Sequence, residues 1–283
     1  IGQVSERADD DRKRCQQYKW EPGGGYQNCR LAQFLEFCDV ADMAELHEKN
    51  AADPGWFWDA AIRFLDVQFY EPYSQILDLS EGIQHPAWCL GAKTNLVLNC
   101  LDKHRDTPTW AKTYLVWEGE DGEKKEFTYA EFDAEVCRFA GALRARGIGR
   151  GDVVATYIPM LPEAMISFFA ILKVGGVVLP LFSGFGPEPL RVRLADSDAR
   201  AVVTADGGPR RGVAAPMKSI LDEVLVDCPT VSDVFVVRRL GDQVACPMTE
   251  GRDHWWDDAV SDQPTTAETE RTDAEEIGFL VYT

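Results

Sequence analysis

The sequence predicts an α/β protein, built mainly on a parallel sheet covered by helices and preceded by an irregular, mostly helical N-terminal cap. From about residue 106 onward, short apolar segments alternate with amphipathic segments of about three turns. The short segments are apolar at successive positions, which is typical of strands buried on both faces of a parallel sheet. We therefore expect a cap over residues 1–105 and an α/β subdomain over residues 106–283.

A hairpin and a capped helix open the α/β subdomain. Apolar segments flank Glu120-Asp121-Gly122, and an Asp-Gly pair supplies the positive φ of a tight hairpin turn. Thr128 stands three residues before Glu131, which is the spacing of a capping box at the start of a helix. The apolar positions that follow share one helix face, and Gly147 suits a left-handed C-cap.

The alternation then continues to residue 237 and changes beyond it. Strands are expected at 153–158, 177–179, 201–204 and 234–237, and helices at 163–174, 187–196 and 217–226. Residues 253–276 hold many acidic side chains and predict a solvated loop, with His254 at the surface and Trp255-Trp256 as its packing anchor. Residues 277–282 are mostly apolar and predict one more buried strand.

The composition narrows the classes of partner. Lys+Arg number 29 against 47 Asp+Glu, and this net charge of −18 repels nucleic acid, so no nucleic-acid partner is expected. No segment approaches the ~20 apolar residues that span a bilayer, and residues 1–14 lack the apolar core of a signal peptide. We expect no membrane association and a cytoplasmic location. The eight cysteines and four histidines show no metal-ligand spacing, so we assign no metal site and expect reduced, mostly buried thiols.

A series of motifs resembles the N-terminal portion of the acetyl-CoA synthetase-like acyl-CoA ligases, in the adenylate-forming superfamily. FTYAEF at residues 127–132 and LKVGGVVLPL at residues 172–181 resemble two motifs of the whole superfamily. Narrower matches follow in the family's order and spacing at residues 95–104, 117–122, 158–163, 185–188, 204–208 and 251–256. The resemblance extends from about residue 54 to the end of the sequence, and residues 1–50 are left unassigned.

This resemblance implies an AMP-forming acid–thiol ligase. A small carboxylic acid would attack the α-phosphate of ATP to give an acyl-adenylate and pyrophosphate, and the thiol of CoA would then form the thioester. ATP and CoA are the implied co-substrates, with Mg²⁺. In the family a phosphate-binding loop follows the strand that ends Tyr-Thr, and here Tyr282-Thr283 stand last. We therefore expect the ATP and Mg²⁺ sites beyond Thr283, in a missing C-terminal part of the same enzyme. On this view the α/β subdomain is incomplete at its C-terminal end, no catalytic residue is assigned, and the fragment alone is inactive.

Some residues that bind CoA in the family align with residues of this sequence. The family's D-x-G-x-R-x-G-R-x-x-P-x-K run aligns with residues 206–218, where Arg210 matches the first CoA arginine. A guanidinium suits the ribose 3′-phosphate through paired N–H donors. Val213 stands in place of the second arginine, and the adjacent Arg211 is a candidate substitute. Ser183 and Gly184 match the glycine-bearing loop beside pantetheine. Solvated charge and ordinary turn geometry are the structural alternatives for these four residues.

Two other functions remain open. The chain could be a non-catalytic module that uses its CoA side for binding or assembly, and Val213 in place of an arginine is compatible with that. It could also be an adenylation domain that serves a carrier protein, since the early motifs would be the same. Residues 95–104 and Trp255-Trp256 favour the CoA ligases. The identity of the acid is not indicated.

Overall fold

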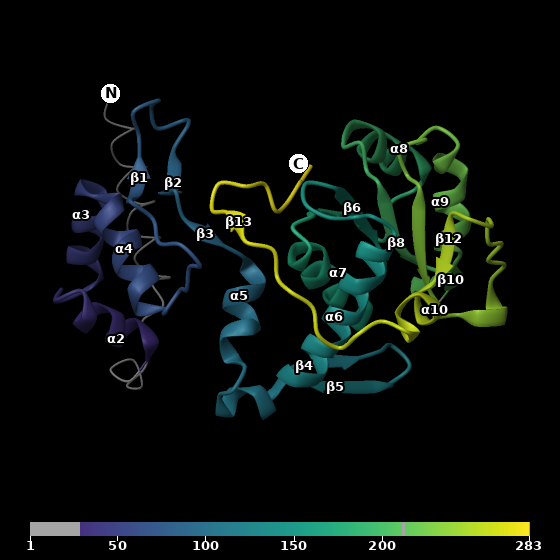
Figure 1. Ribbon diagram of the computed structural model, residues 1–283, viewed down its shortest axis with the longest axis horizontal. Helices are drawn as coiled ribbons and strands as arrows, with labels where there is room; N and C mark the ends of the chain where they lie inside the picture. Colours follow the sequence, from purple (N-terminus) through teal and green to yellow (C-terminus); the bar gives the residue numbers. More distant parts are fainter. Residues whose placement is uncertain (1–28, 211–212, 283) are drawn as a thin grey trace, which may run out of the picture. The chain divides into compact units, whose positions relative to one another are not determined.

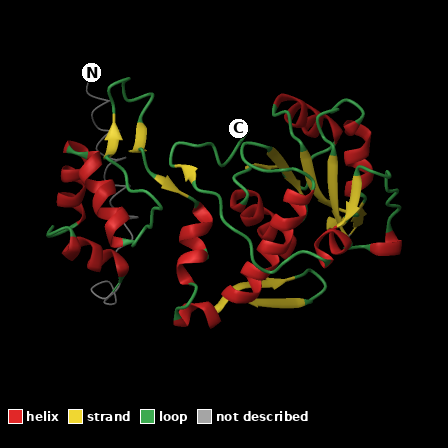
Figure 2. Cartoon of the chain, viewed as in Figure 1, coloured by secondary structure: helices red, strands yellow, loops and turns green. Residues whose placement is uncertain are grey.

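The computed structural model describes residues 29–210 and 213–282 (Figures 1 and 2). The chain divides into two compact units, with the boundary between Val67 and Gln68. The described part of the first unit is helical, as predicted for the cap, with α2 (Arg30–Phe37), α3 (Met43–Ala52) and α4 (Pro54–Phe64). Its small core includes Phe34, Leu35, Leu46 and Ala60.

The second unit begins with short elements that precede the main sheet. They are β1 (Gln75–Asp78), β2 (Ala87–Leu90), β3 (Lys93–Thr94), α5 (Leu96–Cys100) and the 3₁₀ helices η2 (Asp102–His104) and η3 (Pro108–Ala111). The predicted hairpin follows as β4 (Thr113–Glu118) and β5 (Lys124–Thr128), with Gly122 at a φ of 81°. Helix α6 (Tyr129–Ala145) starts with the expected capping box of Thr128 and Glu131, and Gly147 follows it at a φ of 69°.

The main sheet has five parallel strands in the order β12-β11-β8-β6-β7. They are β6 (Val153–Tyr157), β7 (Val177–Pro180), β8 (Ala201–Ala205), β11 (Asp233–Val237) and β12 (Asp253–Trp255). The predicted α/β fold and its first four strands are therefore confirmed.

Helices cover both faces of this sheet, as strands apolar on both faces require (Figure 1). Helices α6 and α7 (Pro162–Lys173) pack on one face with Val154, Val178 and Val203. Helices α8 (Pro187–Asp196) and α9 (Met217–Leu225) pack on the other face with Ala155 and Leu179. Successive residues of each strand thus alternate between two separate cores.

The prediction of a solvated loop over residues 253–276 is wrong in its first part. Residues 253–255 form β12, which pairs in parallel with β11, and α10 (Trp256–Ser261) follows directly. His254, expected at the surface, is half-buried, and its Nε2 lies 3.0 Å from Oδ1 of Asp233. Trp256 is buried and stacks on Phe139 with ring centroids 4.0 Å apart, so its role as a packing anchor is confirmed.

The buried strand predicted at residues 277–282 is also not formed. The segment makes a single parallel bridge to β7, through the Val178 N–H to the Gly278 carbonyl and the Leu280 N–H to the Val178 carbonyl. Leu280 packs against the core between the sheet and α8, whereas Ile277 and Val281 are both 66% exposed. On the other side Phe279 contacts the ring of Phe168 in α7 but stays 43% exposed, so that side of the segment is covered only in part, which is the physical reason for the difference.

The remaining elements are small. They are the hairpin β9 (Gly208–Arg210) and β10 (Val213–Ala215), the 3₁₀ helix η4 (Gly241–Gln243), and β13 (Thr272–Asp273), which pairs with β3. In the described residues no helix is both long and apolar enough to cross a membrane. The seven described cysteines are free thiols, of which three are buried and four half-buried, so burial is less general than predicted.

Candidate functional site at the carboxyl edge of the sheet

The carboxyl ends of β6 and β8 mark a topological switch in the sheet. The two strands are neighbours, but β6 continues through α7 to β7 on one side, and β8 continues through α9 to β11 on the other. Helices α7 and α9 also lie on opposite faces of the sheet. Open α/β sheets bind ligands in the crevice outside such a point, so this edge is the expected position of a ligand site.

Glycines allow the loops after β6 and β8 to approach closely. A Cβ atom at Gly208 would lie 2.9 Å from Cγ of Pro159, in the loop after β6. A Cβ atom at Gly207 would lie 2.6 Å from the carbonyl oxygen of Ala215, in β10. Since real Cβ atoms do not approach so closely, both positions need glycine for this packing.

The Asp206 carboxylate ties the loop after β8 to the loop after β11. It is 1% exposed and accepts hydrogen bonds from the backbone N–H groups of Gly207, Arg239, Leu240 and Gly241, over distances of 2.6 to 3.2 Å. Its oxygens are therefore occupied by main-chain donors. Asp206 positions the loop and is not available as a ligand.

The loop after β7 lies at the same edge and contains Ser183 and Gly184. Both residues are half-buried in a turn that the Phe185 N–H closes by donating to the Phe182 carbonyl at 2.9 Å. The hydroxyl of Tyr157, at the end of β6, donates to the carbonyl of Phe185 at 2.9 Å. This bond attaches the loop after β7 to the central strand β6.

The structure places the other CoA-side candidates on and beside the β9–β10 hairpin. Arg210 ends β9, and its backbone is paired with Val213, the first residue of β10. Arg211 lies outside the described residues. Val213 is 68% exposed, so the position where the family has its second arginine faces solvent. Ser183, Gly184 and Arg210 thus lie on loops that leave one edge of the sheet.

Tyr282 packs beside the loop after β7. The guanidinium of Arg193 lies 4.8 Å from the ring centroid of Phe185 and 5.3 Å from that of Tyr282. The Tyr282 hydroxyl donates to the carboxylate of Asp196 at 2.5 Å, and burial together with this acceptor raises the pKa of Tyr282 to about 12. A tyrosine in this state is a hydrogen-bond donor, so we assign it no role as a base.

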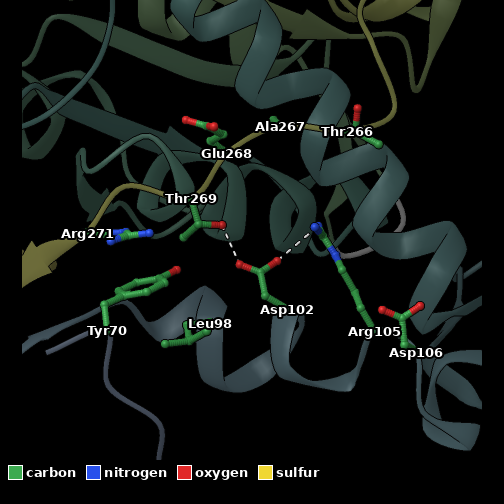
Figure 3. Close-up of a pocket in the computed structure, with 10 residues that line it drawn as sticks. All are labelled: Tyr70, Leu98, Asp102, Arg105, Asp106, Thr266, Ala267, Glu268, Thr269 and Arg271. Atoms are coloured by element: carbon green, nitrogen blue, oxygen red, sulfur yellow. Dashed lines mark hydrogen bonds and ion pairs between the residues drawn. The ribbon is translucent and has the colours of Figure 1, made fainter. Parts of the chain in front are cut away.

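A separate cavity of about 760 Å³ lies away from this edge (Figure 3). It is lined by Tyr70, Leu98, Asp102, Arg105, Asp106, Thr266, Ala267, Glu268, Thr269 and Arg271. The carboxylate of Asp102 lies between the hydroxyl of Thr269 and the guanidinium of Arg105, both of which bind it (Figure 3). Burial and the nearby charge of Asp102 raise the pKa of Tyr70.

Sequence reasoning missed the buried charge cluster behind this cavity. Lys173 is 0% exposed, and its Nζ lies 3.2 Å from Oδ1 of Asp102 and 3.6 Å from Oδ1 of Asp133. Arg105 pairs with both carboxylates, at 3.1 Å and 2.6 Å. The available signal was a lysine inside the otherwise apolar LKVGGVVLPL motif, because a buried lysine needs a partner.

No described residues are arranged as a resident metal centre. Mg²⁺ is held by several oxygen ligands around one point. Over residues 29–210 and 213–282, no three or more histidine, cysteine, aspartate or glutamate side chains are grouped so that they could hold a metal ion. The described residues therefore form no site that binds a metal ion through protein side chains alone, and we derive no chemical step through Mg²⁺.

Known proteins resemble the chain along most of its length. It is 40% identical over 248 residues to the acetyl-coenzyme A synthetase of Gemmatimonas aurantiaca, and 39% identical over 243 residues to acetyl-coenzyme A synthetase 2 of Pseudomonas putida. Each match covers 86% of this chain and 37% of the relative, so the chain spans little more than a third of these relatives. The solved acetoacetyl-CoA synthetase from Streptomyces lividans superposes with a TM-score of 0.81 at 23% identity, over 93% of this chain and 41% of that one, which supports the fold.

Two family models also match, and together they confirm the resemblance inferred from the motifs. Residues 43–100 match the acetyl-coenzyme A synthetase N-terminus, so the resemblance begins at residue 43, earlier than the motifs indicated, and includes residues 43–50. Residues 102–283 match the AMP-binding enzyme model, which is more than half of the chain. The chain therefore belongs to the AMP-binding enzyme family.

Proposed function

We propose that this chain is the CoA-facing N-terminal portion of an ATP-dependent acyl-CoA synthetase. The complete enzyme would convert a small carboxylic acid, ATP and CoA into acyl-CoA, AMP and pyrophosphate through an acyl-adenylate. Membership of the AMP-binding family and the names of the relatives support the reaction class. The relatives are acetyl-coenzyme A synthetases, which makes acetate the first acid to test.

One observation supports the CoA side of this proposal most directly. The loops after β6, β7 and β8 meet at the switch point, through the bond from Tyr157 to Phe185 and the close approach of Gly208 to Pro159. The candidates on these loops offer backbone N–H groups, a hydroxyl and a guanidinium. Those groups match a phosphorylated, hydroxyl-bearing and amide-bearing ligand such as CoA.

Each candidate has a separate part in this proposal. Arg210 would bind the ribose 3′-phosphate by paired N–H donors, as a guanidinium binds phosphate elsewhere. The turn at Ser183 and Gly184 would let the pantetheine chain lie close to the backbone. Mg²⁺ bound with ATP would offset charge on the phosphates, and the protein groups that hold both would come from the rest of the enzyme. On this assignment the chain alone does not form an adenylate.

Calorimetry on the purified chain tests the proposal, with CoA, 3′-dephospho-CoA and ATP as titrants. We expect CoA to bind, dephospho-CoA to bind about tenfold more weakly because one charge-assisted contact is lost, and ATP to show no binding. Arg210→Ala should lower the CoA affinity to that of dephospho-CoA. Arg63→Ala is the matched control, because Arg63 is an exposed arginine in the first unit.

Two results would contradict the assignment. ATP binding tighter than CoA binding would place the nucleotide site within this chain. An unchanged CoA affinity in Arg210→Ala would remove the assigned phosphate contact. The exposed Val213 favours the alternative of a non-catalytic assembly module, and a folded chain that binds no CoA at all would support that function instead.

A further inference from the structure

A polar strap crosses the helices of the second unit between α10 and β7. We define the strap as residues 266–276, which run beside α6, α7 and α5 before β13 pairs with β3 (Figure 1). Thr266, Ala267, Glu268, Thr269 and Arg271 belong to it and supply half of the residues that line the cavity in Figure 3. The strap is therefore one wall of that cavity.

Hydrogen bonds hold residues 266–271 of the strap, with little apolar packing, whereas ion pairs of Asp273 with Lys93 and of Glu276 with Arg150 anchor its C-terminal end beside β3. Arg144 of α6 donates to the carbonyl of Glu268 at 2.9 Å. The buried Asn95 donates to the carbonyl of Glu270 at 3.0 Å, and the Glu270 N–H donates to the carbonyl of Lys173 at 2.9 Å. Within the strap, Ala267 is the one residue that packs against the main core in the described structure. Water can replace such hydrogen bonds when a segment lifts, so residues 266–271, most of which line the cavity, have a lower cost of opening than the anchored end.

Thr269 contributes the side chain that links the described part of the strap to the buried charges. Its hydroxyl accepts from Nζ of Lys173 at 2.9 Å and donates to Oδ2 of Asp102 at 2.5 Å. Lys173 has no exposed surface, and Oδ1 of Asp133 has no hydrogen-bond partner among the described residues. The buried charge cluster thus has fewer hydrogen-bond partners than its polar atoms can use. The Thr269 hydroxyl supplies one partner to Lys173 and one to Asp102.

We propose that the strap is a hinged cover, and that the hydroxyl of Thr269 is the latch that keeps it closed. In the closed state the Thr269 hydroxyl binds both Lys173 and Asp102, and the strap forms one wall of the cavity. When the strap lifts, water hydrates these two charges, and the cavity merges with solvent. The two residues that bind the Thr269 hydroxyl lie in segments that carry the family resemblance, Asp102 in residues 95–104 and Lys173 in residues 172–181. The inference stands on the strap contacts and does not depend on CoA binding.

Hydrogen exchange on the whole chain tests this latch, with Thr269→Val as the principal variant. Valine has nearly the shape of threonine and lacks the hydroxyl, so both buried charges lose a partner. We expect exchange in strap peptides, including the Glu270 amide, to accelerate about ten- to a hundredfold, with exchange in β8 and β11 unchanged. Thr269→Ser keeps the hydroxyl and should restore slow exchange. Thr265→Val, an exposed position next to the strap, is the matched control.

Tryptic cleavage gives a second readout of the same opening. Arg271 is exposed but is followed directly by β13, so cleavage after it requires the strap to lift. Thr269→Val should be cut there faster than the wild type, Thr269→Ser and Thr265→Val. Unchanged strap exchange in Thr269→Val would overturn the proposal. Acceleration spread equally over β8 and β11 would also overturn it, because the cluster would then stabilise the whole core and not the strap.

Discussion

Asp206→Asn tests whether a single carboxylate positions the loops at the carboxyl edge. One oxygen accepts from Gly207, Arg239 and Leu240, and the other accepts from Gly241 at 2.8 Å and Leu240 at 3.2 Å. Asparagine keeps one acceptor oxygen and turns an NH₂ group toward donors at the other. The bond to Gly241 is lost, and two donors then face each other.

The size of this effect follows from the burial of the groups involved. A hydrogen bond to a charged acceptor contributes about 1.5–3 kcal/mol. Asp206 is 1% exposed, so its amide would find no alternative partner, whereas Gly241 is exposed and water can reach its N–H. We therefore expect the free energy of unfolding to fall by about 1.5–3 kcal/mol for the lost bond, and by about 1–3 kcal/mol more because the buried NH₂ group of the asparagine has no acceptor.

Urea unfolding followed by far-UV circular dichroism measures this loss, and hydrogen exchange localises it. The amides of Leu240 and Gly241 should exchange faster in Asp206→Asn than in the wild type. Asp242→Asn is the matched control, because Asp242 is exposed and the change should stay within about 0.5 kcal/mol. The reasoning is refuted if Asp206→Asn unfolds like the wild type, or if both variants lose the same stability.

Three further predictions concern the site, the core and acid stability. Val213→Arg places a second cation on the strand position paired with Arg210, so we expect calorimetry to show CoA affinity rising about tenfold, with 3′-dephospho-CoA little affected. Phe139→Ala removes a fully buried ring that stacks on Trp256, so urea unfolding should show a loss of about 3–5 kcal/mol. Burial alone would raise the pKa of Asp233, but hydrogen bonds from three neighbouring side chains hold it below its usual value. The ionised form therefore stabilises the fold above the unfolded pKa of about 3.9, and this is lost as the pH falls through the lower folded pKa. The stability deficit of Asp233→Asn in urea unfolding should be full at pH 7 and shrink below pH ~4.

The fold was largely predictable because its signals are local. Each of the first four strands of the main sheet is a run of apolar residues, and the helix after the hairpin carries a capping box in its own sequence. Hydrophobic periodicity and capping depend on residues within a few positions of one another. They are accordingly visible without knowledge of the tertiary structure.

The elements that were predicted wrongly depend on distant partners. Strand β12 has the sequence Asp-His-Trp and forms because β11 offers a free edge and Asp233 binds His254. Residues 277–282 have the apolar sequence of a strand, but burial requires cover on both sides, and the described structure covers the second side only in part. Neither condition is encoded within the segment itself.

The site was predictable only in part, for the same reason. The resemblance named Ser183, Gly184 and Arg210 by alignment, and the structure shows that their loops leave one edge of the sheet. The latch joins Thr269 to Lys173, 96 positions apart, and although Lys173 belongs to the LKVGGVVLPL motif, nothing in that motif indicates Thr269 as its partner. Their pairing required the structure.

The central claim is that the loops after β6, β7 and β8 bind CoA, and amide chemical-shift mapping by NMR tests it most directly. CoA added to the labelled chain should shift the amides of residues 183–186 and 206–210 and leave those of the strap unchanged. The claim would be contradicted if CoA shifted only the amides of the strap and of the residues that line the cavity in Figure 3, and left the amides at the carboxyl edge of the sheet unchanged.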